Sequence, residues 1–106
     1  GHRNLGRLAE RTFYGMARTG AFGSNGSGDY AIAFSTAPAA SAPTPEQLAN
    51  DAMQPLFEAV VEATEEAILD SLFTARTVEG FHGTVPALPV AEVVRLMRRN
   101  KVADER

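Results

Sequence analysis

The chain contains no cysteine, and its apolar runs fall far short of a membrane span. Without cysteine there is neither a disulfide nor a thiolate-bound metal, and the redox compartment stays undetermined. A transmembrane helix needs about 20 consecutive apolar residues, so the sequence predicts no membrane-spanning segment. The N-terminus is charged, lacks an initiator methionine and has no signal-peptide pattern, so we expect a processed or trimmed piece. We expect a cytoplasmic location, with the periplasm as the alternative.

Basic residues are missing from the middle of the chain. Residues 37–75 carry seven acids and neither lysine nor arginine, whereas residues 1–36 and 76–106 each have a net charge of +2. We interpret the acidic block as the solvated face of one helix. The net charge of −3 suggests no polyanion, so we expect neither nucleic acid nor a membrane as a partner. A length of 106 residues suits a single domain.

Three segments have the apolar spacing of amphipathic helices. They are residues 2–19, residues 56–73 and a last helix that begins at Pro89 and runs through Asn100. Gly20 is placed as the glycine that ends the first helix. The middle helix is expected to bury one stripe of side chains, namely Phe57, Val60, Val61, Thr64, Ile68 and Leu72.

Helix-start and turn signals lie between these segments. Residues 44–47, "TPEQ", resemble a capped helix start, and Pro55 is expected either to kink that helix or to open a second one. Residues 79–89, "EGFHGTVPALP", are rich in turn formers and leave room for a short extended piece.

Residues 29–36 alternate between bulky and small side chains, which predicts a strand. Tyr30, Ile32 and Phe34 would point to one side, while small or polar residues would point to the other. We expect both faces to be covered. Because one strand cannot form a stable sheet, the chain must borrow strands from a partner or from residues before its start. The order helix, strand, helix, turn, helix indicates an α/β (α+β) fold.

A glycine-rich segment, "SNGSG", precedes this strand. If strand geometry reaches back to Ser27, its hydroxyl and the Asp29 carboxylate leave the same face and could orient a positively charged or proton-donating group. Gly26 and Gly28 would admit a ligand or another backbone, and Asn25 adds an amide, so these three are candidates for substrate binding.

Two other interpretations of this segment stay open. One is a glycine-rich turn whose polar side chains satisfy their own backbone. The other is a phosphate-binding loop, although no phosphate-loop motif is present. His2 and His82 have no metal-ligand spacing, and Glu65 is expected to be solvated. The sequence therefore gives no indication of a metal or a cofactor.

Two stretches resemble a known family. "ARTGAFGSNGSGDYAIAFSTA" followed by "PLFEAVVEATEEAILDSLFTA" is similar to the β-chain of the L-aminopeptidase D-Ala-esterase/amidase family, to which the β-peptidyl aminopeptidases belong. The resemblance implies an N-terminal-nucleophile type of hydrolase whose precursor cuts itself into an α-chain and a β-chain. It also implies one domain, residues 1–106, that is half of a four-layer α/β/β/α sandwich completed by the α-chain, with αβ pairs assembling further.

The resemblance assigns roles to two residues of this chain. Ser27 and Asp29 match the family's serine and acid beside the nucleophile, so their implied role is to orient the nucleophilic serine and its α-amino group. The nucleophile leads a strand that is missing here, and the oxyanion-hole donor belongs to the α-chain. This chain alone is therefore expected to be inactive.

The leading hypothesis is an aminopeptidase or amidase acting on short peptides, amides or esters with a free amine. The alternative is a non-catalytic subunit or ligand-binding module that uses the same half-fold. If the first hypothesis holds, the Ser27 hydroxyl and the Asp29 carboxylate should lie side by side toward a cleft that a separate polypeptide completes.

Overall fold

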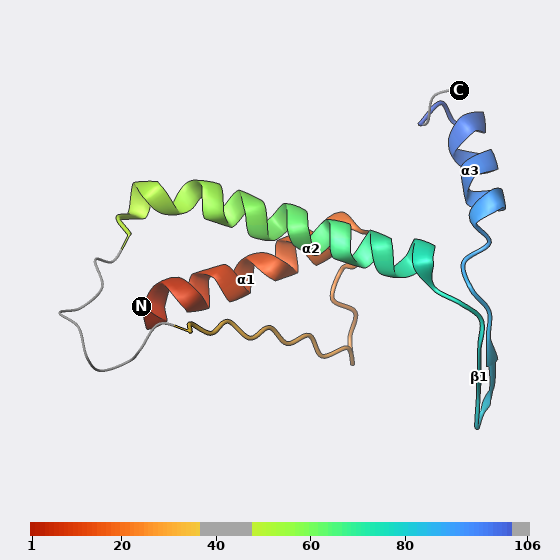
Figure 1. Cartoon of the computed structure of the whole chain (residues 1–106), viewed down its shortest axis with the longest axis horizontal. Helices are drawn as coiled ribbons and strands as arrows, with labels where there is room; N and C mark the ends of the chain where they lie inside the picture. Colours follow the sequence, from red (N-terminus) through yellow and green to blue (C-terminus); the bar gives the residue numbers. More distant parts are fainter. Residues whose placement is uncertain (37–47, 103–106) are drawn as a thin grey trace. The chain divides into compact units, whose positions relative to one another are not determined.

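The structure, a computed structural model, describes residues 1–36 and 48–102. Within them the chain is a small mixed α/β protein (Figure 1). Its elements are α1 (His2–Arg18), the 3-10 helix η1 (Asn50–Met53), α2 (Gln54–Thr74), β1 (Val78–Gly80), β2 (Gly83–Val85) and α3 (Val90–Arg99). The chain divides into two compact units, Gly1–Ile68 and Leu69–Arg106.

The first helix forms as predicted and ends at the predicted glycine. The Gly20 amide donates to the carbonyl of Ala17 at 3.0 Å, and Gly20 itself has a φ of +96°. A residue with a Cβ rarely adopts this left-handed conformation, so glycine at this position ends α1. Leu5, Leu8 and Met16 of the apolar stripe are half-buried.

The helix predicted at residues 56–73 is confirmed as the greater part of α2. Pro55 lies in its first turn, so this proline opens a second helix, which was one of the two alternatives predicted for it. The predicted helix start at residues 44–47 lies outside the described residues. Of the predicted stripe Phe57 is buried, four members are half-buried, and Leu72 is exposed.

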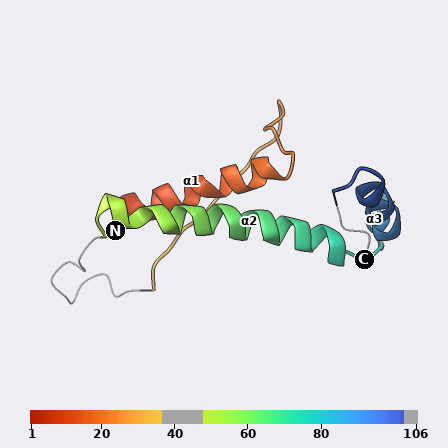
Figure 2. The ribbon, with the colours of Figure 1, turned by 90° about the horizontal axis from the view of Figure 1, so that it is seen from above.

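Within the first unit, α1 and α2 lie side by side in both views (Figures 1 and 2). They approach each other closely at Gly15, where an added Cβ would lie 2.5 Å from the carbonyl oxygen of Val61. The core beside this contact is small, with Met53 1% exposed and Phe57 9% exposed. The close approach places the facing side chains of the two helices along one groove.

The predicted strand at residues 29–36 is wrong for this chain. No strand is assigned there, and the segment runs as an extended trace alongside α1 (Figure 1). Ala31 and Ala33 are half-buried and line one hollow with residues of α1. Tyr30, Ile32 and Phe34 are 93%, 89% and 79% exposed, so only the small face is covered. The alternation predicted the two faces, but a strand also needs a hydrogen-bonding neighbour, and no described segment supplies one.

In the second unit, β1 and β2 form an antiparallel hairpin with Val78 opposite Val85 and Gly80 opposite Gly83. The sequence predicted only a turn with a short extended piece here. All six strand residues are exposed. The base of the hairpin is closed by the Ala87 amide, which donates to the Thr77 hydroxyl at 3.1 Å.

The last helix, α3, is confirmed within the predicted range. Val93, Val94 and Met97 are half-buried, and Arg98 and Arg99 lie in the last turn, where positive charge complements the helix dipole. In the part of the chain that the structure describes, no helix has both the length and the apolar character to cross a membrane.

Candidate active-site loop

The glycine-rich segment leaves α1 as an exposed loop with fixed bends. Gly26 has a φ of +90°, and no atom lies within 4 Å of the position that a Cβ would occupy. The backbone conformation rather than a lack of space therefore requires glycine here. This bend positions Asn25 and Ser27 on either side of it.

Ser27 takes part in a local turn. Its amide donates to the Ser24 carbonyl at 3.0 Å, and its hydroxyl donates to the same oxygen at 2.9 Å. Strand geometry therefore does not reach back to Ser27 in this chain, which was the condition for its hydroxyl and the Asp29 carboxylate to leave the same face. The hydroxyl behaves as the turn interpretation predicts, because it satisfies the backbone of its own loop.

The two predicted site residues are both on the surface. Asp29 is exposed and makes no hydrogen bond or ion pair with another described residue, and Ser27 and Asn25 are exposed as well. This chain by itself therefore does not enclose Ser27 and Asp29 in a cleft. The Asp29 carboxylate keeps all its acceptor positions for another group.

Gly28 permits a close approach, but the approaching group comes from this chain. A Cβ at Gly28 would lie 3.4 Å from Cε2 and 3.5 Å from the hydroxyl oxygen of Tyr30. The ring of Tyr30 therefore lies beside the backbone that joins the two site residues.

Two other polar residues considered in the sequence, His82 and Glu65, each contact another side chain of this chain. The rings of His82 and Phe81 make an edge contact with centroids 4.9 Å apart. Glu65 was expected to be solvated, but it is half-buried and bonds the Arg18 guanidinium at 2.9 Å. The described residues contain no group of three or more His, Asp or Glu side chains that could hold a metal ion.

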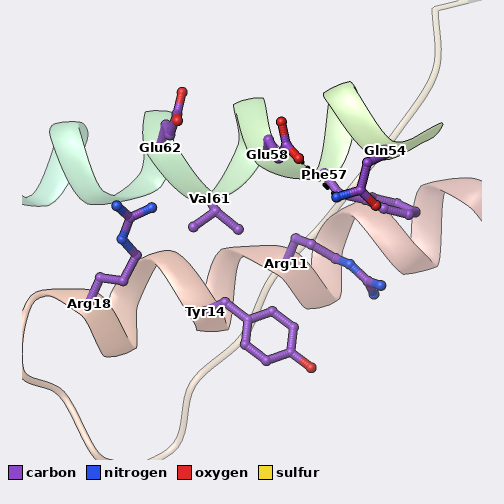
Figure 3. Close-up of a pocket in the computed structure, with 8 residues that line it drawn as sticks. All are labelled: Arg11, Tyr14, Arg18, Gln54, Phe57, Glu58, Val61 and Glu62. Atoms are coloured by element: carbon purple, nitrogen blue, oxygen red, sulfur yellow. Dashed lines mark hydrogen bonds between the residues drawn. The ribbon is translucent and has the colours of Figure 1, made fainter. Parts of the chain in front are cut away.

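A groove between α1 and α2 was missed by the sequence reasoning. It is open to solvent and has a volume of about 280 Å³, and Figure 3 shows the side chains that line it. Arg11 and Tyr14 come from α1, while Phe57, Glu58 and Glu62 come from α2. Its sequence signal is a set of arginines on α1 and of glutamates on α2 at helical spacing, but these residues line one groove only because the helices pack together.

Comparison with known proteins gives consistent matches over most of the chain. The model of peptidase family S58 matches residues 1–86. Two proteins named β-peptidyl aminopeptidase BapA are similar over 102 residues: that of Sphingosinicella microcystinivorans is 43% identical, and that of Sphingosinicella xenopeptidilytica is 34% identical. These alignments cover 90% and 89% of this chain but 26% and 25% of those proteins.

A solved structure agrees with them. The PH0078 protein from Pyrococcus horikoshii OT3 superposes with a TM-score of 0.82 at 44% identity, over 93% of this chain and 30% of that one. The chain thus spans between a quarter and a third of the length of the relatives it matches. The predicted resemblance to the L-aminopeptidase D-Ala-esterase/amidase family is confirmed: the chain belongs to peptidase family S58.

Proposed function

We propose that this chain is the β-chain part of a serine aminopeptidase or amidase of the N-terminal-nucleophile type. The substrates are short peptides, amides or esters with a free amine. The observation that carries the proposal is the family match across residues 1–86, which contain both Ser27 and Asp29. The names of the two aminopeptidase relatives support the same reaction class.

A second polypeptide completes the fold in this proposal. The bulky face of Tyr30, Ile32 and Phe34 is exposed, and about three quarters of the curated relatives' length has no counterpart in this chain. An α-chain from the same precursor would add the neighbouring strands and cover that face. The product is half of a four-layer α/β/β/α sandwich joined to its other half, and αβ pairs assemble further.

The chemistry is acyl transfer to an N-terminal serine outside this chain, followed by hydrolysis of the acyl-enzyme. The α-amino group of that serine accepts the proton of its own hydroxyl as the oxygen attacks the substrate carbonyl. It passes this proton to the leaving amine or alcohol as the scissile C–N or C–O bond breaks. The Asp29 carboxylate stabilises the protonated amine, which raises the pKa of that amine and makes it a stronger base. Ser27 orients the nucleophile by hydrogen bonding, once its hydroxyl exchanges the Ser24 carbonyl for the new partner.

Replacing Asp29 tests this role. In the intact protein, Asp29→Asn removes the charge but keeps the shape, and we expect kcat to fall by at least about tenfold, since acid–base groups contribute about 10²- to 10⁴-fold. The substrates are p-nitroanilides that carry L-aminoacyl, D-alanyl or β-aminoacyl groups. Asp51→Asn is the matched control, because Asp51 is also an exposed aspartate but lies in η1. Unchanged kinetics in Asp29→Asn would rule the role out.

The mass of the native complex distinguishes the enzyme from a non-catalytic module. We expect a companion chain that begins upstream of this sequence and a short N-terminal segment led by serine. A serine-directed covalent reagent should add its mass to that serine. A complex that binds aminoacyl amides, hydrolyses none and takes up no reagent would be a ligand-binding module instead.

A further inference from the structure

We propose that Asn25 is a site of spontaneous modification, at which the Gly26 nitrogen attacks the Asn25 side chain and converts it to aspartate or isoaspartate. Asn25 alone among the asparagines of the sequence is followed by glycine. Glycine has no Cβ, so no side chain of the next residue covers the attacking nitrogen. The modification does not depend on the proposed function, whereas its effect on activity rests on that function.

Both reacting groups are free in the part of the chain that the structure describes. Asn25 and Gly26 are exposed, and the Asn25 side-chain amide makes no hydrogen bond with another described residue. The Gly26 amide donates to no described residue either. Apart from its neighbours in the chain, no atom lies within 4 Å of the position that a Cβ of Gly26 would occupy, so the loop around it is open.

The local turn leaves the Gly26 nitrogen available. The Ser27 amide donates to the Ser24 carbonyl at 3.0 Å, which places Asn25 and Gly26 at the two central positions of the turn. Gly26 has a φ of +90°, which is typical of glycine at the third position of a turn. The bond that closes the turn therefore uses the amide of Ser27. Few contacts restrain the centre of an exposed turn, so the Asn25 side chain can rotate toward the next nitrogen.

The reaction needs only the chain and water. The Gly26 nitrogen loses its proton to solvent and bonds to Cγ of Asn25, while the bond from Cγ to Nδ2 breaks and this nitrogen takes up a proton and leaves as ammonia. The product is a five-membered succinimide ring. Water then opens the ring at either carbonyl. Opening at Cγ gives aspartate, whereas opening at the main-chain carbonyl gives isoaspartate, whose main chain runs through Cβ and Cγ.

The remaining asparagines are internal controls, because each is followed by a residue with a side chain. Each of them also has a hydrogen-bonded side chain: Asn4 and Asn50 accept from arginines of α1, and Asn100 donates to the Leu96 carbonyl at 2.8 Å. Such a side chain must break its hydrogen bond before it can rotate toward the next nitrogen. We therefore expect Asn25 to convert first.

Either product changes the loop that carries Ser27 and Asp29. Aspartate adds a negative charge to the same loop as Asp29, and nearby like charges raise each other's pKa. Isoaspartate also lengthens the main chain between Ser24 and Ser27 by one methylene group. The turn that now holds the Ser27 amide on the Ser24 carbonyl then cannot close with the same geometry. We expect hydrolytic activity to fall as isoaspartate accumulates.

The experiment is timed peptide mapping of the intact native protein by mass spectrometry, during incubation at mildly alkaline pH. Isoaspartyl methyltransferase labels the isoaspartate. We expect most of the peptide that contains Asn25 to gain the mass difference between an amide and an acid, while Asn4, Asn50 and Asn100 stay unchanged. The conversion should be slower at mildly acidic pH, because the attacking nitrogen must lose its proton.

Matched variants assign the change to Asn25. Asn25→Gln should remove the mass gain, because its longer side chain would have to close a six-membered ring. Activity on the p-nitroanilides should decline during incubation in the parent protein, whereas Asn25→Gln should keep the activity with which it starts. Asn50→Gln is the control and should leave the conversion of Asn25 unchanged.

Three outcomes would overturn the proposed modification. They are an unchanged Asn25 peptide, conversion no faster than at the other asparagines, and the same mass gain in Asn25→Gln. Activity that stays constant while Asn25 converts would refute the effect on the loop. A protein that converts Asn25 but hydrolyses no substrate would contradict the proposed function and leave the modification standing.

Discussion

The close packing of α1 against α2 depends on Gly15, because this residue has no Cβ. An added Cβ would lie 2.5 Å from the Val61 carbonyl oxygen and 2.7 Å from the Thr64 Cβ. Backbone atoms of α2 cannot move aside without separating the helices, so we expect Gly15→Ala to destabilise the protein by about 1–3 kcal/mol. The free energy of unfolding of the intact protein, measured in urea, tests this.

Gly6 provides the control within the same helix. No atom lies within 4 Å of its Cβ position, so Gly6→Ala adds a helix-favouring residue in open space. We expect a gain of up to about 1 kcal/mol, because alanine loses less backbone entropy on folding. If Gly15→Ala and Gly6→Ala shifted stability by the same amount, the close approach at Gly15 would be refuted.

Glu92 gives a pH dependence to α3. The Arg95 guanidinium donates to its carboxylate, with one nitrogen at 2.8 Å, and this hydrogen bond lowers the pKa of Glu92 below its ordinary value of 4.5. A group whose pKa is lowered by folding stabilises the folded form above its unfolded pKa, and this contribution is lost as the pH falls through the folded pKa.

We therefore expect α3 to lose helicity as the pH falls through the folded pKa of Glu92. The ¹³Cα chemical shifts of the residues in α3 measure this loss. The ¹³C shift of the Glu92 carboxyl group should titrate below the ordinary value. Glu92→Gln should remove the Glu92 titration and the part of the pH dependence that it causes. A Glu92 pKa at or above the ordinary value would contradict the ion pair.

At the scale of the elements, the three helices could be predicted because their apolar period is a local property of the sequence. Gly20 and Pro55 also mark helix ends by local backbone chemistry. The segment at residues 29–36 could not be predicted in the same way. Its alternation shows which side chains share a face, but a strand forms only where a neighbour supplies hydrogen bonds.

In the candidate site, too, the features that depend on neighbouring residues in the sequence could be predicted, whereas those that depend on packing could not. The identity of Ser27 and Asp29 as site candidates came from their pattern and from the family resemblance. The turn that holds Ser27 could be predicted as an alternative because it needs only neighbouring residues. The groove beside Arg11 could not be predicted, since it exists only once two helices pack together.

The hairpin depends on a hydrogen bond outside its strand ladder. Thr77→Val keeps the shape of the side chain but removes the acceptor of the Ala87 amide. We expect this amide to exchange its hydrogen at least about fivefold faster, since a hydrogen bond of about 1 kcal/mol is lost. Thr84→Val, within β2, is the control and should leave the exchange of Ala87 unchanged.

At the scale of the whole molecule, the described residues bury very few apolar side chains. Met53 and Phe57 are the buried ones, whereas many large apolar side chains are exposed. A domain of this size already has little surplus stability when its core is complete. We expect the 106-residue chain alone to unfold without a cooperative urea transition, and to unfold cooperatively if the α-chain of the proposed function is bound to it. A sharp transition for the isolated chain would show that it needs no partner.

If the chain is cut from a precursor, as the proposed function requires, the exposed row of Tyr30, Ile32 and Phe34 also bears on the timing of that cut. An extended, unpaired segment with bulky apolar side chains is a ready template for aggregation when it is released into water. A precursor that was cut while still nascent would free this surface before anything shielded it. Cleavage should therefore follow folding, so that the two chains are already packed together when the peptide bond between them breaks.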